Sequence, residues 1–277
     1  MLIQKCVLTL LSATFIAATA CSVVAQEWKS GVEWQKPPIV TPGGTNDAAP
    51  SDAVVLFDGT NLDQWLNGEK WKIEDGIAIP QETQIVTKQH FGDIQLHVEW
   101  SAPPEIHGEG QGRGNSGIYL MGLYEVQVLD SFNNETYFDG QAGSIYKQTP
   151  PMANAMRKPG EWNYYDIIFN GPRFKGNGDL EQPGYVTLIQ NGVLMLNHFE
   201  LHGASGFVAA PHYQAHAETG PIAIQFHNDP VRFRNIWVRE IKPPVGRRIG
   251  PPFNLQPAQK KEEPKVEPTD DKKEVSN

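Results

Sequence analysis

The sequence predicts an all-β protein, a jelly-roll β-sandwich built from two curved antiparallel sheets. Three observations indicate this fold class: many short apolar runs, frequent turns, and the absence of long segments with helical periodicity. The 277 residues include 26 glycines and 22 prolines, which interrupt regular elements often. Because an all-β sandwich can reach roughly 200–250 residues as one domain, the length fits a single domain with extensions.

The candidate strands follow one another with turn residues between them. The first is the apolar run Val54–Phe57. The dipeptides Asp75-Gly76 and Asn191-Gly192 each separate two apolar segments, 71–74 from 76–79 and 185–190 from 193–199. Dipeptides of this kind typically form two-residue hairpin turns. Further strands are expected at 94–100, 164–169, 222–227 and 231–241.

The stretch from Gly114 to Asp130 is the most informative of the chain. It predicts two short strands hinged at Gly122. Successive side chains of a strand point to opposite faces, so the apolar members of Tyr124–Val128 share one face, while Glu125 and Gln127 share the other. Burying a carboxylate beside an amide costs free energy, whereas the same two groups exposed at a surface can bind a polar ligand. The alternative is the solvated outer face of an ordinary strand.

Other predicted strands also carry a polar face. Glu99 lies on the polar face of 94–100, and Gln225 and His227 lie on that of 222–227. In a curved sheet the outward polar face becomes a groove. We therefore expect Glu99, Glu125, Gln127 and His227 to line one concave surface. A slip of one residue, or a bulge, would invert any one of these assignments.

Four residues are candidates for catalysis: Glu125, His227, Asp130 and Lys147. The imidazole of His227 can exchange a proton near neutral pH, although a lone histidine is often structural. Lys147 follows a glycine-rich turn and can stabilise an oxyanion, or it is a surface lysine. Asp130 can meet Glu125 only if the strand bulges near Leu129, and otherwise it caps a turn.

Five residues are candidates for substrate binding: Glu99, Gln127, Arg113, Asn115 and Gln225. Arg113 and Asn115 lie in a glycine-rich stretch and can hold sugar hydroxyls or a carboxylate. Alternatively, the glycines there serve only tight turns. The chain has seven tryptophans, eight tyrosines and twelve phenylalanines, which can stack on sugar rings, and most of them belong in the core.

Charge and motif content exclude several functional classes. A formal net charge of −9 and a pI near 5.4 argue against nucleic-acid binding, which needs a basic surface. The sequence has no zinc-ligand array, no G-x-S-x-G motif and no dinucleotide-binding fingerprint. The sequence indicates no particular cofactor, and a divalent cation such as calcium, held by carboxylate and carbonyl oxygens, is compatible with it.

The two ends of the chain differ from the middle. Residues 1–25 are expected to be a signal peptide, because Lys5 precedes an apolar segment and small residues precede a cut after Ala25. Export to the periplasm or the medium follows, and the alternative is a lipid anchor on Cys21. No later segment is apolar enough to span a membrane. We expect an extended arm at 26–51, the jelly-roll domain at 52–242, and a disordered tail rich in Pro, Lys and Glu at 243–277.

Several motifs, taken in order, resemble the bacterial 3-keto-disaccharide hydrolase domain family, which has a concanavalin/laminin-G-like jelly roll. The resemblance covers about Val54 to Ile241. Its carriers are Leu56–Gly59, Trp65, Trp71, Glu74–Gly76, Gly92–Glu99, Gly114–Tyr119, Tyr124–Asp130, Gly143–Tyr146, Trp162–Asp166, Asn191–Val193 and Gly220–Trp237.

The resemblance implies cleavage of glycosides that are already oxidised at C3 of a sugar ring. A 3-ketone acidifies the hydrogen at C2, so that a base removes it, the oxygen at C1 leaves by elimination, and water then adds. Glu125 or His227 is then the base, Asp130 or Glu99 assists the leaving group, and Lys147 or a metal ion supports the enolate. An upstream sugar 3-dehydrogenase that supplies the substrate is the implied partner.

Two positions depart from the family pattern. Met121 stands where the family often has Arg or Gln, and Phe226 stands where it often has Asp. Both are expected beside the groove.

The alternative function is a non-catalytic, lectin-like carbohydrate-binding module that uses the same groove. A retaining glucanase needs two carboxyl groups roughly 5–5.5 Å apart, and Gln127 in place of the central acid disfavours it.

Overall fold

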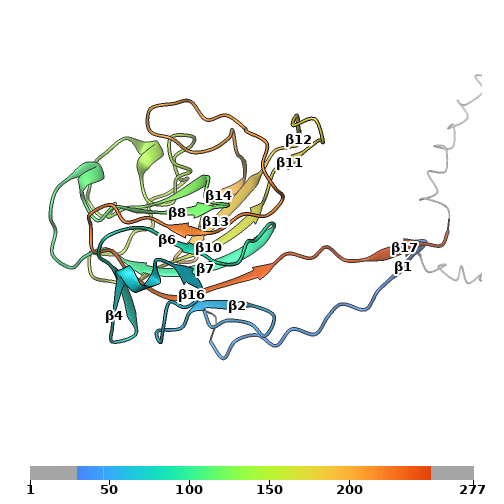
Figure 1. Cartoon of the computed structure of the whole chain (residues 1–277), viewed down its shortest axis with the longest axis horizontal. Coiled ribbons are helices and arrows are strands. Elements are labelled where there is room, and N and C mark those ends of the chain that lie inside the picture. The colour runs from blue at the N-terminus through green and yellow to red at the C-terminus, as the bar shows by residue number, and fades with distance from the viewer. Residues whose placement is uncertain (1–29, 46, 251–277) are drawn as a thin grey trace, which may run out of the picture. The chain divides into compact units, whose positions relative to one another are not determined.

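The computed structural model describes residues 30–45 and 47–250 (Figure 1). The predicted signal peptide, the alternative anchor at Cys21 and most of the predicted tail therefore lie outside the described residues. The chain divides into two units, and the larger one spans Pro37–Pro243. In the described part of the chain, no helix is long and apolar enough to cross a membrane.

Two antiparallel sheets form the larger unit, and Figure 1 shows them as layers. The eight-stranded sheet has the order β14 (Val193–Glu200), β13 (Tyr185–Gln190), β10 (Asn163–Asn170), β7 (Ile94–Ser101), β16 (Arg232–Glu240), β5 (Ile77–Pro80) and β4 (Trp71–Glu74), and β2 (Val54–Phe57) also pairs with β16. The five-stranded sheet has the order β3 (Trp65–Leu66), β6 (Ile85–Thr87), β15 (Ala223–Ile224), β8 (Ser116–Leu120) and β9 (Tyr124–Val128).

The remaining elements of this unit are short. β11 (Arg173–Phe174) pairs with β12 (Leu180–Gln182). The helical turns of the described residues are three 3₁₀ turns, η1 (Gly68–Lys70), η2 (Gly110–Gly112) and η3 (Phe138–Gly140). The prediction of an all-β, antiparallel two-sheet fold is therefore confirmed.

The expected hairpins form where the turn dipeptides indicated them. Asn191 and Gly192 have φ angles of 53° and 81°, and Asp75 and Gly76 have 51° and 75°. Asparagine, aspartate and glycine tolerate this left-handed region better than other residues. The hinge between β8 and β9 also lies at Gly122. The segment 222–227 is shorter as a strand than expected, because pairing on β15 covers only Ala223 and Ile224.

The core lies between the two sheets, and the alternation of the strands decides which side chains enter it. The apolar residues of β9 and of β7 are 0–1% exposed, so the predicted faces of both strands are confirmed. One hydrogen bond ties the layers together: the Tyr165 hydroxyl of β10 donates to the Gln127 carbonyl of β9 at 2.8 Å. This buried contact fixes β9 against the larger sheet.

The smaller unit consists of the two ends of the described chain. β1 (Val32–Trp34) pairs antiparallel with β17 (Gly246–Arg248), and Arg247 forms an ion pair with Glu33 at 2.7 Å. The segment from 243 onward was expected to lack structure, and β17 corrects this expectation for three residues. The reason is a partner strand far away in the sequence, which tail composition alone does not reveal.

A polar cluster lies on the face of the eight-stranded sheet that points away from the core. His97 of β7 is 1% exposed, and its ring stacks between Tyr164 and Trp237. Its Nδ1 lies 2.7 Å from Asp166 Oδ1, and its Nε2 lies 3.8 Å from Glu99 Oε1. Burial lowers the pKa of His97, but the two carboxylates outweigh burial and raise it to about 9.

The protonation of this cluster should appear in the pH dependence of stability. A histidine with a raised pKa stabilises the fold fully below its unfolded value near 6.5, and this contribution is lost as the pH rises toward about 9. We expect the free energy of unfolding to fall by on the order of 2 kcal/mol over that window. His97→Asn should remove this loss, as measured by urea unfolding at several pH values.

The exposed His107 provides the matched control. His107→Asn should retain the wild-type loss of stability between pH 6.5 and 9. A His97→Asn protein that loses as much stability as the wild type across this window would contradict the account of the cluster.

Candidate active site

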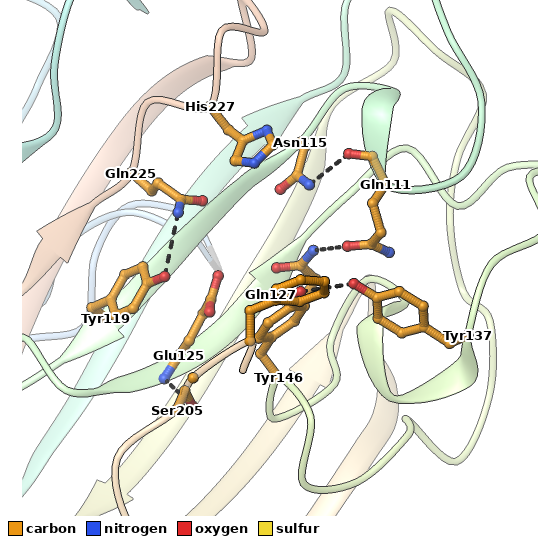
Figure 2. A pocket seen from close by; sticks show the side chains of 12 residues that line it. Gln111, Asn115, Tyr119, Glu125, Gln127, Tyr137, Tyr146, Ser205, Gln225 and His227 are labelled. Atoms are coloured by element: carbon orange, nitrogen blue, oxygen red, sulfur yellow. Dashed lines mark hydrogen bonds between the residues drawn. The ribbon is translucent and has the colours of Figure 1, made fainter. Parts of the chain in front are cut away.

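A cavity of about 430 Å³ opens on the face of the five-stranded sheet that points away from the core (Figure 2). Tyr119 of β8 and Glu125 and Gln127 of β9 point into it from the sheet. Gln111 of η2 and Asn115 line one side, and Gln225 and His227 enter from the segment that follows β15. The remaining lining residues are Tyr137, Tyr146, Ser205, Gly206 and Phe207.

Two loops that wall the cavity are tied to the backbone of Glu125. The Tyr146 N–H donates to the Glu125 carbonyl at 3.1 Å, as part of a segment that pairs with the free edge of β9. On the same edge of β9, the Glu125 N–H donates to the Ser205 hydroxyl at 3.0 Å. Both loops therefore take their position from the strand that carries the carboxyl group.

Glu125 is the acid of the cavity, and its carboxyl group is buried. The residue is 5% exposed, and burial raises its pKa to about 7, although a hydrogen bond from Tyr119 opposes this effect. Among the residues that line the cavity in the described chain, no other carries a carboxyl group. A carboxyl group with this pKa is present in both protonation states near neutral pH, as a general base requires.

The Gln127 amide lies between Glu125 and Gln111. One terminal atom of the amide is 3.0 Å from Gln111 Oε1. The other is 3.1 Å from Glu125 Oε1 and 3.3 Å from the Ser116 carbonyl, and the amide nitrogen belongs at this position, where it donates to the carboxyl group.

Two phenols of the cavity, those of Tyr119 and Tyr146, stay protonated at neutral pH. Burial and the nearby Glu125 carboxylate raise the pKa of Tyr119, and burial and Tyr137 raise that of Tyr146. The hydroxyls of Tyr137 and Tyr146 lie 2.7 Å apart. These side chains are therefore hydrogen-bond donors, and the Tyr137–Tyr146 pair can deliver a proton to a bound ligand.

Gly117 makes room for the carboxyl group of Glu125. It lies on β8 opposite Gln127, and a Cβ atom at this position would collide with Glu125 Oε1. The carboxyl group thus lies across a strand position that has no side chain. The glycine is needed for close approach and not for an unusual backbone angle.

The cavity brings together five of the residues predicted from the sequence: Glu125, Gln127, Asn115, Gln225 and His227. Four others lie elsewhere. The expectation that Glu99 shares this surface is wrong, because β7 belongs to the other sheet. There the Glu99 carboxylate accepts from Arg234 at 2.6 Å and from Asn235 at 2.7 Å.

Asp130 and Arg113 pair with each other outside the cavity. Arg113 Nε donates to Asp130 Oδ2 at 2.7 Å, and both side chains are buried. Asp130 Oδ1 also accepts from the Phe132 N–H at 3.1 Å. The turn-capping alternative for Asp130 therefore describes it correctly, and the expected catalytic and substrate-binding positions of Asp130 and Arg113 are corrected. The two residues hold the loop beyond β9.

Lys147 is not among the residues that line the cavity, so its expected place beside the carboxyl group is corrected. Its ammonium lies 3.2 Å from the centroid of the Tyr137 ring and 3.8 Å from Asp139. Neither Met121 nor Phe226 lines the cavity. The expected position of Met121 beside the groove is wrong, because Met121 is buried at the β8–β9 turn. Phe226 stands between two lining residues, Gln225 and His227.

Sequence reasoning missed the tyrosines and the loop residues of the cavity. Tyr119 had a signal, because it alternates with the buried Ile118 and so belongs on the same face as Glu125. Tyr137, Tyr146, Ser205 and Phe207 lie in irregular segments. No periodic pattern could have placed them. In the described part of the chain, no cluster of three or more His, Cys, Asp or Glu side chains suited to a metal ion occurs.

Comparison with known proteins identifies the family. A model of 3-keto-alpha-glucoside-1,2-lyase-like domains matches residues 52–239. The chain belongs to this family. The resemblance seen in the sequence is thereby confirmed, and the protein is a carbohydrate-active domain of the hydrolase and lyase type.

Solved structures agree with this assignment. A protein from Parabacteroides distasonis assigned to the glycosyl hydrolases is 47% identical, with a TM-score of 0.73 over 78% of this chain and 95% of its own. Two others from the same organism and with the same assignment are 22% and 21% identical, with TM-scores of 0.51 and 0.50. They cover 69% and 68% of this chain and 94% and 99% of their own, and at this identity they support the fold alone. No curated protein matches the chain.

The space above Gly117 provides a test of the site. Gly117→Ala places a methyl group where the Glu125 carboxyl group lies, so the carboxyl group must shift. We expect kcat/KM for a 3-keto-glucoside to fall at least tenfold, with a loss of stability of about 1–3 kcal/mol. Steady-state kinetics and thermal unfolding measure the two effects.

Gly176 is the matched control, because a Cβ atom there would meet no neighbour within 4 Å. Gly176→Ala should leave kcat/KM and the unfolding temperature at their wild-type values. Full activity of Gly117→Ala would show that the position of the Glu125 carboxyl group does not matter for turnover.

Proposed function

We propose that this protein cleaves the glycosidic bond of 3-keto-glucosides by elimination, with Glu125 as the base that removes the hydrogen at C2. The supporting observation is a single buried carboxyl group with a pKa of about 7, in a cavity whose other polar groups are amides, hydroxyls and an imidazole. Family membership supplies the substrate class.

The reaction needs one base, one proton donor and a partner for the enolate. Glu125 takes the C2 proton, and the electron pair of the C2–H bond moves toward the ketone to form an enolate at the C3 oxygen. The enolate then expels the C1 oxygen, which leaves with a proton as an alcohol, and a C1–C2 double bond remains. Addition of water, with OH at C1 and H at C2, gives the free 3-keto-sugar.

The residues of the cavity fit these roles. The amide groups of Asn115 and Gln225 line the cavity and can donate to the enolate oxygen. We assign protonation of the leaving oxygen to Tyr146, because this residue lines the cavity and because Tyr137 is hydrogen-bonded to its hydroxyl. His227 lies exposed in the cavity wall and can activate the water that adds to the double bond.

A two-carboxylate mechanism has less support. A retaining glycosidase needs a second carboxyl group roughly 5–5.5 Å from the first. Asp130, the candidate for that role, is engaged with Arg113 outside the cavity. Elimination from a ketone needs only one base, and Glu125 is the one carboxyl-bearing residue among those that line this cavity in the described chain.

Glu125→Gln provides the direct test of the base. It keeps the shape of the side chain and removes the basic group, so kcat should fall by about 10²–10⁴-fold while the unfolding temperature changes little. In the wild type, kcat/KM should rise as the pH passes about 7, because the ionised form of Glu125 is the active one. Assays with a 3-keto-glucoside between pH 5 and 9 measure both effects.

Glu99→Gln is the matched control, since Glu99 is also a buried glutamate but lies outside the cavity. It should lower stability and keep the wild-type kcat/KM. Unchanged turnover by Glu125→Gln would remove Glu125 from the mechanism. Retained sugar binding without turnover in the wild type itself would favour the lectin-like alternative.

We further propose that the protein is exported, and that an oxidoreductase of the same compartment forms the 3-ketone. The pattern of residues 1–25 supports export. The mature protein should begin at Gln26 and remain in the soluble fraction, as shown by N-terminal sequencing after fractionation of the source cells. Membrane-bound protein that Cys21→Ser releases would support the lipid anchor instead.

A further inference from the structure

The loop between β14 and β15 carries a phenylalanine at the opening of the cavity. Ser205 fixes the base of this loop, because its N–H donates to the Leu123 carbonyl at 2.9 Å and its hydroxyl accepts from the Glu125 N–H at 3.0 Å. Ala204 is tied to His212 by a backbone hydrogen bond of 3.2 Å. The residues between them form a closed tip of which Phe207 is part.

Phe207 is 71% exposed and still lines the cavity. A single exposed apolar residue needs no explanation by itself. Here, however, the ring belongs to a loop whose base is hydrogen-bonded to the strand of Glu125. The exposed ring is therefore part of the same cavity wall that the strand of Glu125 positions.

Lys147 lies next to this ring. Its ammonium lies 5.9 Å from the centroid of the Phe207 ring and 3.2 Å from that of Tyr137. The backbone of Lys147 has a φ of 60°, which is unusual for a lysine, and its N–H donates to the Asp139 carbonyl at 2.9 Å. The opening thus combines one exposed aromatic ring with a cation whose backbone is constrained.

We propose that Phe207 and Lys147 form the subsite for the leaving sugar, with the Phe207 ring stacking on it and the Lys147 ammonium donating to its hydroxyls. The proposal rests on the proposed elimination, in which the C1 oxygen departs from a ring held at Glu125. One face of a pyranose is made of C–H groups and stacks on an aromatic ring. Its hydroxyls can accept hydrogen bonds from the Lys147 ammonium, which an unsubstituted aryl group cannot do.

Three substrates separate these contributions: a 3-keto-disaccharide, a phenyl 3-keto-glucoside and a methyl 3-keto-glucoside. With Phe207→Ala, the ratio of kcat/KM for the disaccharide to that for the methyl glucoside should fall about tenfold, chiefly through KM. Phe207→Trp should restore the ratio. Lys147→Gln should lower the ratio for the disaccharide more than the ratio of phenyl to methyl glucoside, because an aromatic ring interacts with the ammonium only through its face.

Val208 provides the matched control, because it is 93% exposed on the same loop and does not line the cavity. Val208→Ala should keep both wild-type ratios. An unchanged disaccharide ratio in Phe207→Ala would overturn the subsite. An equal effect of Lys147→Gln on the phenyl and disaccharide ratios would overturn the donation from Lys147 to the sugar hydroxyls.

Calorimetry of substrate binding distinguishes a failure of the proposed subsite from a failure of the proposed reaction. Binding of the 3-keto-disaccharide to Glu125→Gln does not depend on turnover, and adding Phe207→Ala should weaken this binding about tenfold. If the wild type cleaves none of the substrates while this weakening is observed, the proposed reaction fails and the subsite stands. If the wild type cleaves them and binding is insensitive to Phe207, the subsite fails and the reaction stands.

Discussion

The two-residue period of β9 is the constraint on which the rest of the site depends. The apolar side chains of Tyr124–Val128 are 0–1% exposed in the core, and the strand geometry then forces Glu125 and Gln127 onto the opposite face. A change of register by one residue would move Glu125 into the core and take three core residues out of the interior. The stability of the sandwich thus keeps the carboxyl group on the cavity face, where burial raises its pKa to about 7.

The local pattern of apolar, polar and turn residues was sufficient to predict most of the fold and the residues at the centre of the site. Alternation places side chains on one face or the other without any knowledge of the partner strand, so the faces of β7 and β9 could be predicted. The dipeptides at 75–76 and 191–192 determine their turns through their own backbone preferences. For the same reason Glu125 and Gln127 could be assigned to one surface from the sequence alone.

The errors arose where position depends on a distant partner. Glu99 has the same alternation as Glu125, but alternation does not say to which of two sheets a strand belongs. Arg113 and Asp130 neutralise each other across 17 positions of the sequence, and a list of polar residues cannot reveal that pairing. The tyrosine pair and the Ser205 loop are positioned by hydrogen bonds to the backbone of β9, which leave no periodic trace in the sequence.

The two sheets therefore use buried charge in different ways. On the larger sheet, Glu99 is ionised and held by Arg234 and Asn235, and the burial of opposite charges is structural. On the smaller sheet, Glu125 has no cationic partner among the residues that line the cavity when His227 is neutral. A base that lacks a neutralising partner is able to take a proton from a carbon acid.

The most direct test of this account is turnover of a 3-keto-glucoside in D₂O, followed by NMR of the product at C2. Elimination and re-addition of water should place solvent deuterium at C2 in the released 3-keto-sugar, after correction for exchange in a parallel reaction with the Glu125→Gln protein. A product that retains its original hydrogen at C2, with no kinetic isotope effect on a C2-deuterated substrate, would contradict the account, because the glycosidic bond would then have been cut with the C2–H bond intact.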